Sequence, residues 1–305
     1  MKGLKGIIYA MISSGTFGLI PLFTIPLSGS LGVNEANILF YRFFFSAIMM
    51  VALCLFRGTS LKIKSHYLLP ILGLGILYAL TALFMVYSYN YIASGVATTI
   101  HFLYPLCVSF IMVFFFKEPK SKSLIIATCL SLVGVGLMCW TDNSSISLFG
   151  IFLSCITIFT YGIYIVGLNK SKVSELSADV LTFYVVLVGV FVFFIYAQFA
   201  SEGIEGIPNM KAGIYLMSLA FLATVVSDFT LILAVKYAGS TVTAILGSME
   251  PLVAVSVGVI VFSEYFTMKT MLGLVLILVS VALVILSDQR KKKQMCAEKI
   301  PIDRN

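Results

Sequence analysis

Two halves of this chain repeat each other at a fixed spacing. Tyr91 recurs as Tyr237, which lies 146 positions later. Six further pairs keep this spacing: Ser94 and Ser240, Pro105 and Pro251, Glu118 and Glu264, Val96 and Val242, Leu106 and Leu252, and Phe116 and Phe262. The first glycines of the two copies lie 144 positions apart: Gly6 with Gly150, and Gly18 with Gly162. A short loop insertion would produce this difference of two positions from the other pairs. The repeat predicts a fold made of two copies of one unit.

The composition places both copies in a lipid bilayer. Hydrophobic residues make up 60% of the 305 residues and charged residues 11%, and the mean hydropathy is +1.06. A soluble domain of this size would lack the polar surface to cover itself. The first apolar stretch is too long for a signal-peptide core and lacks a small-residue cleavage site, so we expect it to stay as a span. None of the six cysteines lies in a C-x-x-C motif, which predicts neither a disulfide framework nor a metal site.

Ten apolar stretches have about the 20 residues that a helix needs to cross the hydrocarbon core. Only helices fit, because the apolar runs are continuous and each segment must satisfy its own backbone in lipid. The expected spans are 4–27, 36–56, 67–90, 95–116, 123–141, 147–168, 180–199, 213–235, 241–263 and 268–287. The predicted fold class is therefore an all-α integral membrane protein with ten transmembrane helices.

The basic residues predict the orientation of these helices. With the N-terminus in the cytoplasm, all of the 20 lysines and arginines except Arg42, Lys211 and Lys269 lie on the cytoplasmic side. This follows the positive-inside rule and predicts a multi-pass protein of the cell inner membrane with both termini cytoplasmic. Five helices per copy is an odd number, so the second copy is expected to be inverted. We expect a first repeat at 1–141, a second, inverted five-helix repeat at 142–287, and a basic cytoplasmic tail at 288–305 that ends the last helix and binds no nucleic acid.

An arginine lies early in the second helix (Tyr41-Arg42-Phe43), and each fourth helix has a proline followed by a glutamate. These are Pro105 with Glu118, and Ser248-Met249-Glu250-Pro251 with Glu264. In these motifs, and over about residues 5–287, the chain resembles the EamA-type ten-helix members of the drug/metabolite transporter superfamily. The resemblance implies transport of small solutes such as amino acids, their derivatives and other metabolites. Arg42 has no counterpart in the second half, where Val185 is aligned with it.

Charged residues inside the spans are the candidates for a solute site, since each costs about 3 kcal/mol at the bilayer centre. They are Arg42, Asp228 and Glu250, together with His101. At about 1.5 Å per residue, Arg42 and His101 lie roughly 10 Å below the outer surface, Glu250 near the midplane and Asp228 closer to the cytoplasm. Arg42 can hold a carboxylate and Glu250 an amine. The alternatives are that Arg42 snorkels or bonds backbone carbonyls, that Asp228 caps a kink or pairs with another helix, and that His101 packs in the core.

Polar residues at helical spacing predict which faces point inward. They are Ser154, Thr157, Tyr161 and Tyr164 on the sixth span; Thr243, Gly247 and Glu250 on the ninth; and Ser14, Gly18 and Pro21 on the first, where close packing explains the stripe equally well. The expected solute-binding set is Arg42, His101, Tyr104, Tyr161, Tyr164 and Glu250, where Tyr104 is the first-copy counterpart of Glu250. Glu250 and Asp228 are expected to carry coupling protons, and Pro105 and Pro251 to let their helices bend during gating.

These features favour a secondary transporter, with export as the expected direction and proton coupling as a hypothesis. A channel, a sensory bundle and an importer of another solute class stay open as alternatives. An enzyme is not expected, because the sequence holds only two histidines and lacks paired carboxylates, an H-E-x-x-H motif and a P-loop. No cofactor, metal, nucleic acid or obligatory protein partner is predicted; the expected partners are a small-molecule solute and the lipid bilayer.

Overall fold

The computed structural model describes residues 2–92, 94–117, 122–139, 147–201, 203–261, 267–269, 271–273, 275–280 and 282–283. Within these ranges the chain is helical and contains no strand. Glu118, Glu264 and the basic tail at 288–305 lie outside the described residues.

Seven helical segments are long and apolar enough to cross a membrane: Leu4–Ser28, Glu35–Phe56, Ser65–Ser88, Leu148–Lys170, Ala178–Ala200, Met210–Ala238 and Ser240–Val261. Each coincides with an expected span. Shorter apolar helices at Tyr104–Phe114, Ile125–Gly134 and Met271–Ser280 fall within the other three. The protein is therefore an all-helical, multi-pass membrane bundle, while the count of ten spans stays a prediction.

Several spans consist of more than one helix. The elements in chain order are α1 (Lys2–Phe17), α2 (Ile20–Ser28), α3 (Glu35–Phe56), η1 (Ser65–Tyr67), α4 (Leu68–Ser88), α5 (Ser94–His101), α6 (Tyr104–Phe114), α7 (Lys122–Cys139), α8 (Leu148–Lys170), η2 (Lys172–Glu175), α9 (Ala178–Ala200), α10 (Met210–Ala220), the π-helix η3 (Phe221–Val226), α11 (Ser227–Ala238), α12 (Ser240–Leu246) and α13 (Met249–Val261). Three starts follow from capping residues, because the side chains of Asn34, Ser147 and Asn209 accept hydrogen bonds from backbone N–H groups of the first turn.

The first, fourth and ninth spans are each divided into two helices, and only the break in the first span was not expected from the sequence. The chain breaks between α1 and α2, between α5 and α6, and between α12 and α13. Each break lies just before a proline, at Pro21, Pro105 and Pro251. A proline lacks the N–H that a helix interior needs but suits the first turn of a new helix, where that donor has no partner. The two breaks at Pro105 and Pro251 occupy matching places in the two halves.

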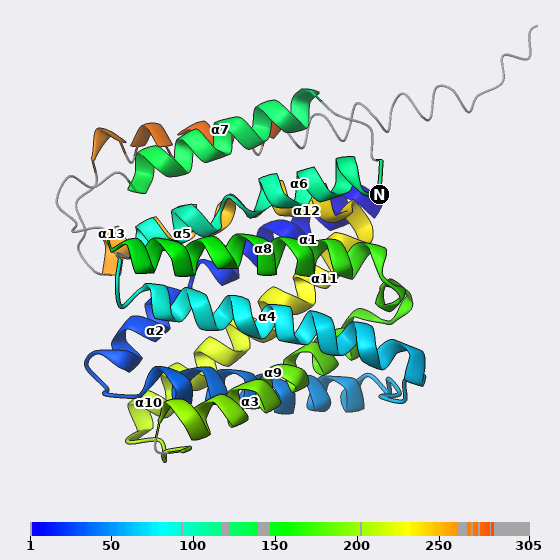
Figure 1. Ribbon diagram of the computed structural model, residues 1–305, viewed down its shortest axis with the longest axis vertical. Helices are drawn as coiled ribbons and strands as arrows, with labels where there is room; N and C mark the ends of the chain where they lie inside the picture. Colours follow the sequence, from blue (N-terminus) through cyan, green and yellow to red (C-terminus); the bar gives the residue numbers. More distant parts are fainter. Residues whose placement is uncertain are drawn as a thin grey trace, which may run out of the picture.

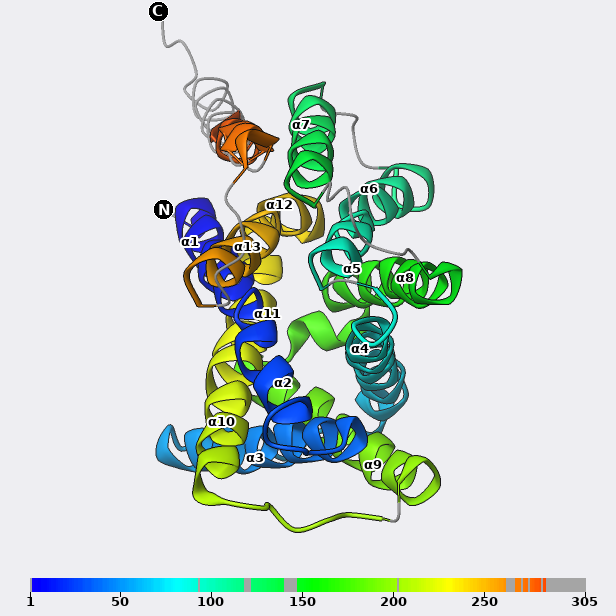
Figure 2. The same ribbon diagram turned by 90° about the vertical axis from the view of Figure 1, so that its left-hand side faces the viewer.

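The helices of one half pack mainly against helices of the other half. α1 packs along α11 and α4 along α8, which pairs the first helix of each half with the third of the other, while α3 packs along α9. Figure 1 shows these helices lying side by side, and Figure 2, turned by 90°, looks along most of them. In Figure 2, α4, α5, α6 and α8 form one side of the bundle, α1, α2, α10 and α11 the other, and α3 with α9 closes one end.

A matched pair of hydrogen bonds fixes the direction of α3 and α9. Tyr41, in the second turn of α3, donates its hydroxyl to the Glu205 carbonyl beyond the end of α9, at 2.5 Å. Tyr184, in the second turn of α9, donates to the Leu61 carbonyl beyond the end of α3, at 2.7 Å. Each helix therefore begins where the other ends, so the two equivalent helices are antiparallel.

Candidate functional site

A small cavity lies inside the bundle where the breaks in the helices meet. Its volume is about 30 Å³, which holds one or two water molecules. It is lined by Phe17, Gly18, Ile20, Pro21, Arg42, Tyr78, Thr81, Ala82, Met85, Val86, Tyr89, Thr98, His101, Tyr161, Glu250 and Ala254. A metabolite does not fit into this volume, so solute binding requires the helices to move apart.

Arg42 is held in the cavity wall by the π-helix of the eighth span. Its side chain is 2% exposed, and its Nε donates to Thr224 Oγ1 at 2.7 Å while its Nη2 donates to the Ala223 carbonyl at 3.0 Å. Ser46, one turn further along α3, donates to the Arg42 carbonyl at 2.7 Å, and its hydroxyl oxygen lies 3.1 Å from the Ala220 carbonyl of the same region. Because the π turn spaces its backbone groups differently from an α-helix, it presents carbonyls to a neighbouring helix, and such segments are frequent at functional sites. Arg42 thus both lines the cavity and bonds a backbone carbonyl.

His101 ends α5 on the opposite wall and is 4% exposed. Its Nδ1 lies 2.8 Å from Thr157 Oγ1, and the Thr157 hydroxyl donates its proton to the Ser154 carbonyl at 2.5 Å. Since that hydroxyl has only one proton, its oxygen accepts the hydrogen bond from Nδ1 of His101. The polar stripe on α8 therefore positions the imidazole.

Glu250 brings a carboxyl group into the cavity from the first turn of α13. The residue is 7% exposed, and its backbone N–H donates to the Gly247 carbonyl at 2.9 Å. Within the part of the chain that the structure describes, no group donates a hydrogen bond to the Glu250 carboxyl and no ion pair joins it to Arg42. Gly18 permits this arrangement, because a Cβ there would lie 2.5 Å from the Glu250 carbonyl oxygen. The carboxyl is therefore the wall group most available to a proton or to a cationic part of a solute.

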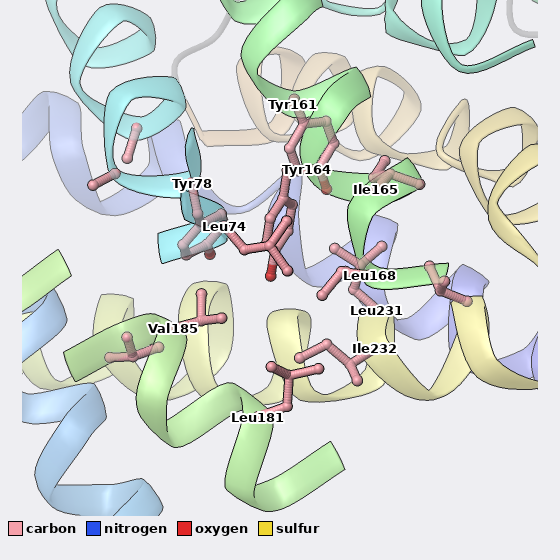
Figure 3. Packing of buried hydrophobic residues seen from close by; sticks show 14 of the residues in the cluster. Leu74, Tyr78, Tyr161, Tyr164, Ile165, Leu168, Leu181, Val185, Leu231 and Ile232 are labelled. Atoms are coloured by element: carbon pink, nitrogen blue, oxygen red, sulfur yellow. The ribbon is translucent and has the colours of Figure 1, made fainter. Parts of the chain in front are cut away.

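Tyr104, Tyr164 and Asp228 lie behind the wall rather than in it, which differs from the expectation for the two tyrosines. Tyr104 packs edge-on against Tyr161 at 4.8 Å and contacts the break at Gly247. Tyr164 is one turn along α8 from Tyr161, and its hydroxyl donates to Asp228 Oδ1 on α11 at 2.7 Å. Figure 3 shows Tyr161 and Tyr164 on α8 beside Tyr78 of α4. Asp228 pairs with another helix, which was one of the alternatives, although its Oδ2 has no partner among the described residues.

The remaining residues of the polar stripes are buried in the bundle. Ser154, Thr157, Thr243 and Ser14 all lie inside. The Ser14 hydroxyl donates to the Ala10 carbonyl at 2.8 Å and lies 3.3 Å from the Leu246 carbonyl, so the stripe on α1 packs against the break in the ninth span. The described residues contain no cluster of three or more histidine, cysteine, aspartate or glutamate side chains that could hold a metal ion.

Sequence reasoning missed the residues around Arg42 and the aromatic wall. Thr224 and Ala223 were not expected to contribute, because a π-helix has no reliable sequence pattern. Phe17 contributes a ring 6.0 Å from that of Tyr161 and 6.4 Å from that of Tyr78, at the break after α1. Pro21 was a usable signal for this break.

A membrane bundle with broken helices and buried charges around a central cavity is the architecture of a solute transporter. The EamA-like transporter family matches this chain twice, over residues 4–140 and 148–286, and the chain belongs to that family. A solved structure titled only "Crystal structure of protein" has the same fold, with a TM-score of 0.77 at 14% identity over 95% of this chain and 98% of that one. No curated protein matches. The family makes this chain a membrane transporter of small solutes.

Proposed function

We propose that this protein is a secondary transporter that exports small polar metabolites, such as amino acids or their derivatives, by alternating access. One observation carries the proposal: the central cavity has a guanidinium in one wall and a carboxyl without a hydrogen-bond partner among the described residues in another. Arg42 binds a carboxylate of the solute and Glu250 an amine. His101 and Tyr161 form the wall between them, and Tyr104 and Tyr164 support Tyr161 from behind.

The architecture in the proposal is ten spans in two inverted halves, 1–141 and 142–287, in an inner membrane with both termini cytoplasmic. The antiparallel pair α3 and α9 and the exchange of packing partners support the inversion. An inverted repeat allows two equivalent shapes, one open to each side. The breaks at Pro105 and Pro251 are the proposed gating points, since each proline removes a helical hydrogen bond and so makes its span easier to bend.

Proton coupling is proposed at Glu250, with Asp228 as a second carrier. A carboxyl in a water-poor cavity binds either a proton or a cationic group of the solute, and exclusive occupancy by one of the two gives obligatory exchange. The small volume of the central cavity favours a carrier over an open pore.

The test is transport by purified protein in liposomes, with a panel of amino acids, amines, sugars and nucleosides, with and without an imposed pH gradient. We expect saturable uptake of zwitterionic solutes that the pH gradient drives. Sugars, which carry neither charge, serve as the matched negative solutes. Equal rates for sugars and amino acids, or no saturable flux of any zwitterion, would refute the proposal.

A further inference from the structure

A groove lies between α6 and α8 on the outside of the bundle. The two helices touch at Gly162, where a Cβ would lie 2.9 Å from Cys107 Sγ. Beyond this contact, toward the ends of both helices, they leave a space of about 410 Å³. Phe115 and Ile163 are 73% and 44% exposed there, and Figure 2 shows both helices at the edge of the bundle, so the groove is open to the hydrocarbon core of the membrane. Its apolar walls are formed by Ile111, Phe115, Phe116, Ile163, Val166 and Gly167.

The polar residues of the groove, Lys170 and Ser171, lie together at one end, where α8 stops. Lys170 Nζ lies over the face of the Phe116 ring, 5.3 Å from its centroid. Such a cation–π contact holds the ammonium group at the rim of the groove. In the proposed orientation this end is cytoplasmic. The groove is therefore apolar at the depth of the acyl chains and cationic at the depth of the lipid headgroups.

The chain around this end carries a net positive charge. Segments 117–122 and 170–175 together contain five lysines and two glutamates. One of these glutamates, Glu175, accepts a hydrogen bond from the Tyr67 hydroxyl at 2.9 Å. Basic clusters on the cytoplasmic side attract anionic lipids, and basic pockets between spans bind their headgroups. The charge and position of this end therefore match an anionic phospholipid.

The other half of the repeat lacks these lysines. At the spacings of 144 and 146, Lys170 corresponds to Pro26 and Lys117 to Ser263. The positive-inside rule explains why lysines gather on the cytoplasmic side, but it does not require one of them to line a groove. The contact between Lys170 and the groove is thus a feature of the first half's fourth span and the second half's first span alone.

We propose that this groove binds one anionic phospholipid of the cytoplasmic leaflet, with an acyl chain between α6 and α8 and its phosphate against Lys170. The inference rests on the orientation in the proposed function but on no property of the transported solute. A lipid in this place contacts α6 beyond the break at Pro105, and α8 beyond Tyr161, which lines the central cavity. It therefore joins a proposed gating helix to a helix of the solute site.

The test is lipid binding to the purified protein in detergent, counted by native mass spectrometry. Phosphatidylglycerol and phosphatidylcholine with identical acyl chains are titrated separately. Loss of one lysine near an anionic headgroup weakens its attraction about fivefold. Lys170→Gln should therefore weaken phosphatidylglycerol binding about fivefold and leave phosphatidylcholine binding unchanged. The matched control is Lys62→Gln, which removes another exposed cytoplasmic lysine that does not line the groove, and we expect no change.

A second variant tests the place of the acyl chain. Ile163→Trp fills the groove, so saturable binding of both lipids should be lost, whereas Ile195→Trp, the same change at an exposed position of α9, should keep it. Equal weakening by Lys62→Gln, equal affinity of the wild type for the two lipids, or binding that survives Ile163→Trp would overturn the site. A dimer that Ile163→Trp dissociates would overturn it too, because the groove would then join two copies of the chain. None of these measurements involves transport, so their failure is distinct from failure of the transport function.

Discussion

Arg42→Lys is the substitution that best separates solute binding from helix packing at this site. The guanidinium donates to both Thr224 Oγ1 and the Ala223 carbonyl, at 2.7 and 3.0 Å. A lysine keeps the charge but has one compact ammonium in place of the planar fork. A hydrogen bond from a charged donor is worth about 1.5–3 kcal/mol, so losing one to the solute carboxylate weakens binding about tenfold to a hundredfold.

Thr224→Val is the matched variant, because it removes the hydroxyl that accepts a hydrogen bond from Arg42 and keeps the Arg42 guanidinium. Thr224 is fully buried, so Arg42 Nε loses its partner and stability falls by about 1–3 kcal/mol. The assays are solute-induced thermal shift and equilibrium binding of a transported zwitterion, with the amount of folded protein in the membrane as control. The reasoning is refuted if Arg42→Lys binds solute like the wild type, or if Thr224→Val weakens binding as much as Arg42→Lys does.

Three further predictions concern topology, coupling and the helix break. Cysteines introduced at Lys122 and Lys269 should be labelled from opposite faces, the first cytoplasmic; labelling from one side contradicts the inverted repeat. Glu250→Gln keeps the shape of the side chain but cannot exchange a proton, so pH-gradient-driven uptake should vanish in liposomes; continued accumulation against the solute gradient excludes the proposed coupling. Gly247→Ala should lower the midpoint of thermal unfolding, because the new Cβ would lie 1.7 Å from Tyr104 Oη; Tyr104→Phe in the same chain should restore part of the loss, and an unchanged midpoint in the single variant contradicts the contact.

The positions of the spans and the starts of several helices follow from the sequence alone. Lipid leaves no partner for a free backbone group, so a continuous apolar run of sufficient length forms a helix whatever surrounds it. Capping residues such as Asn34 and Asn209 act on the first turn of their own helix and are equally local. The repeat at Pro105 and Pro251, and the burial of Arg42, His101 and Glu250, were also predicted from the sequence.

Only the tertiary structure decided which polar groups meet. Tyr161 and Tyr164 share one face of α8, yet one lines the cavity and the other bonds Asp228. Helical spacing specifies only the direction in which a side chain leaves its own helix. The groups that this side chain contacts depend on where the neighbouring helices cross. The contact between Arg42 and the π turn of the eighth span likewise follows from tertiary packing, since the backbone carbonyl that Arg42 bonds carries no sequence signal. Local chemistry thus determined the helices, and contacts between residues far apart in the chain determined the site.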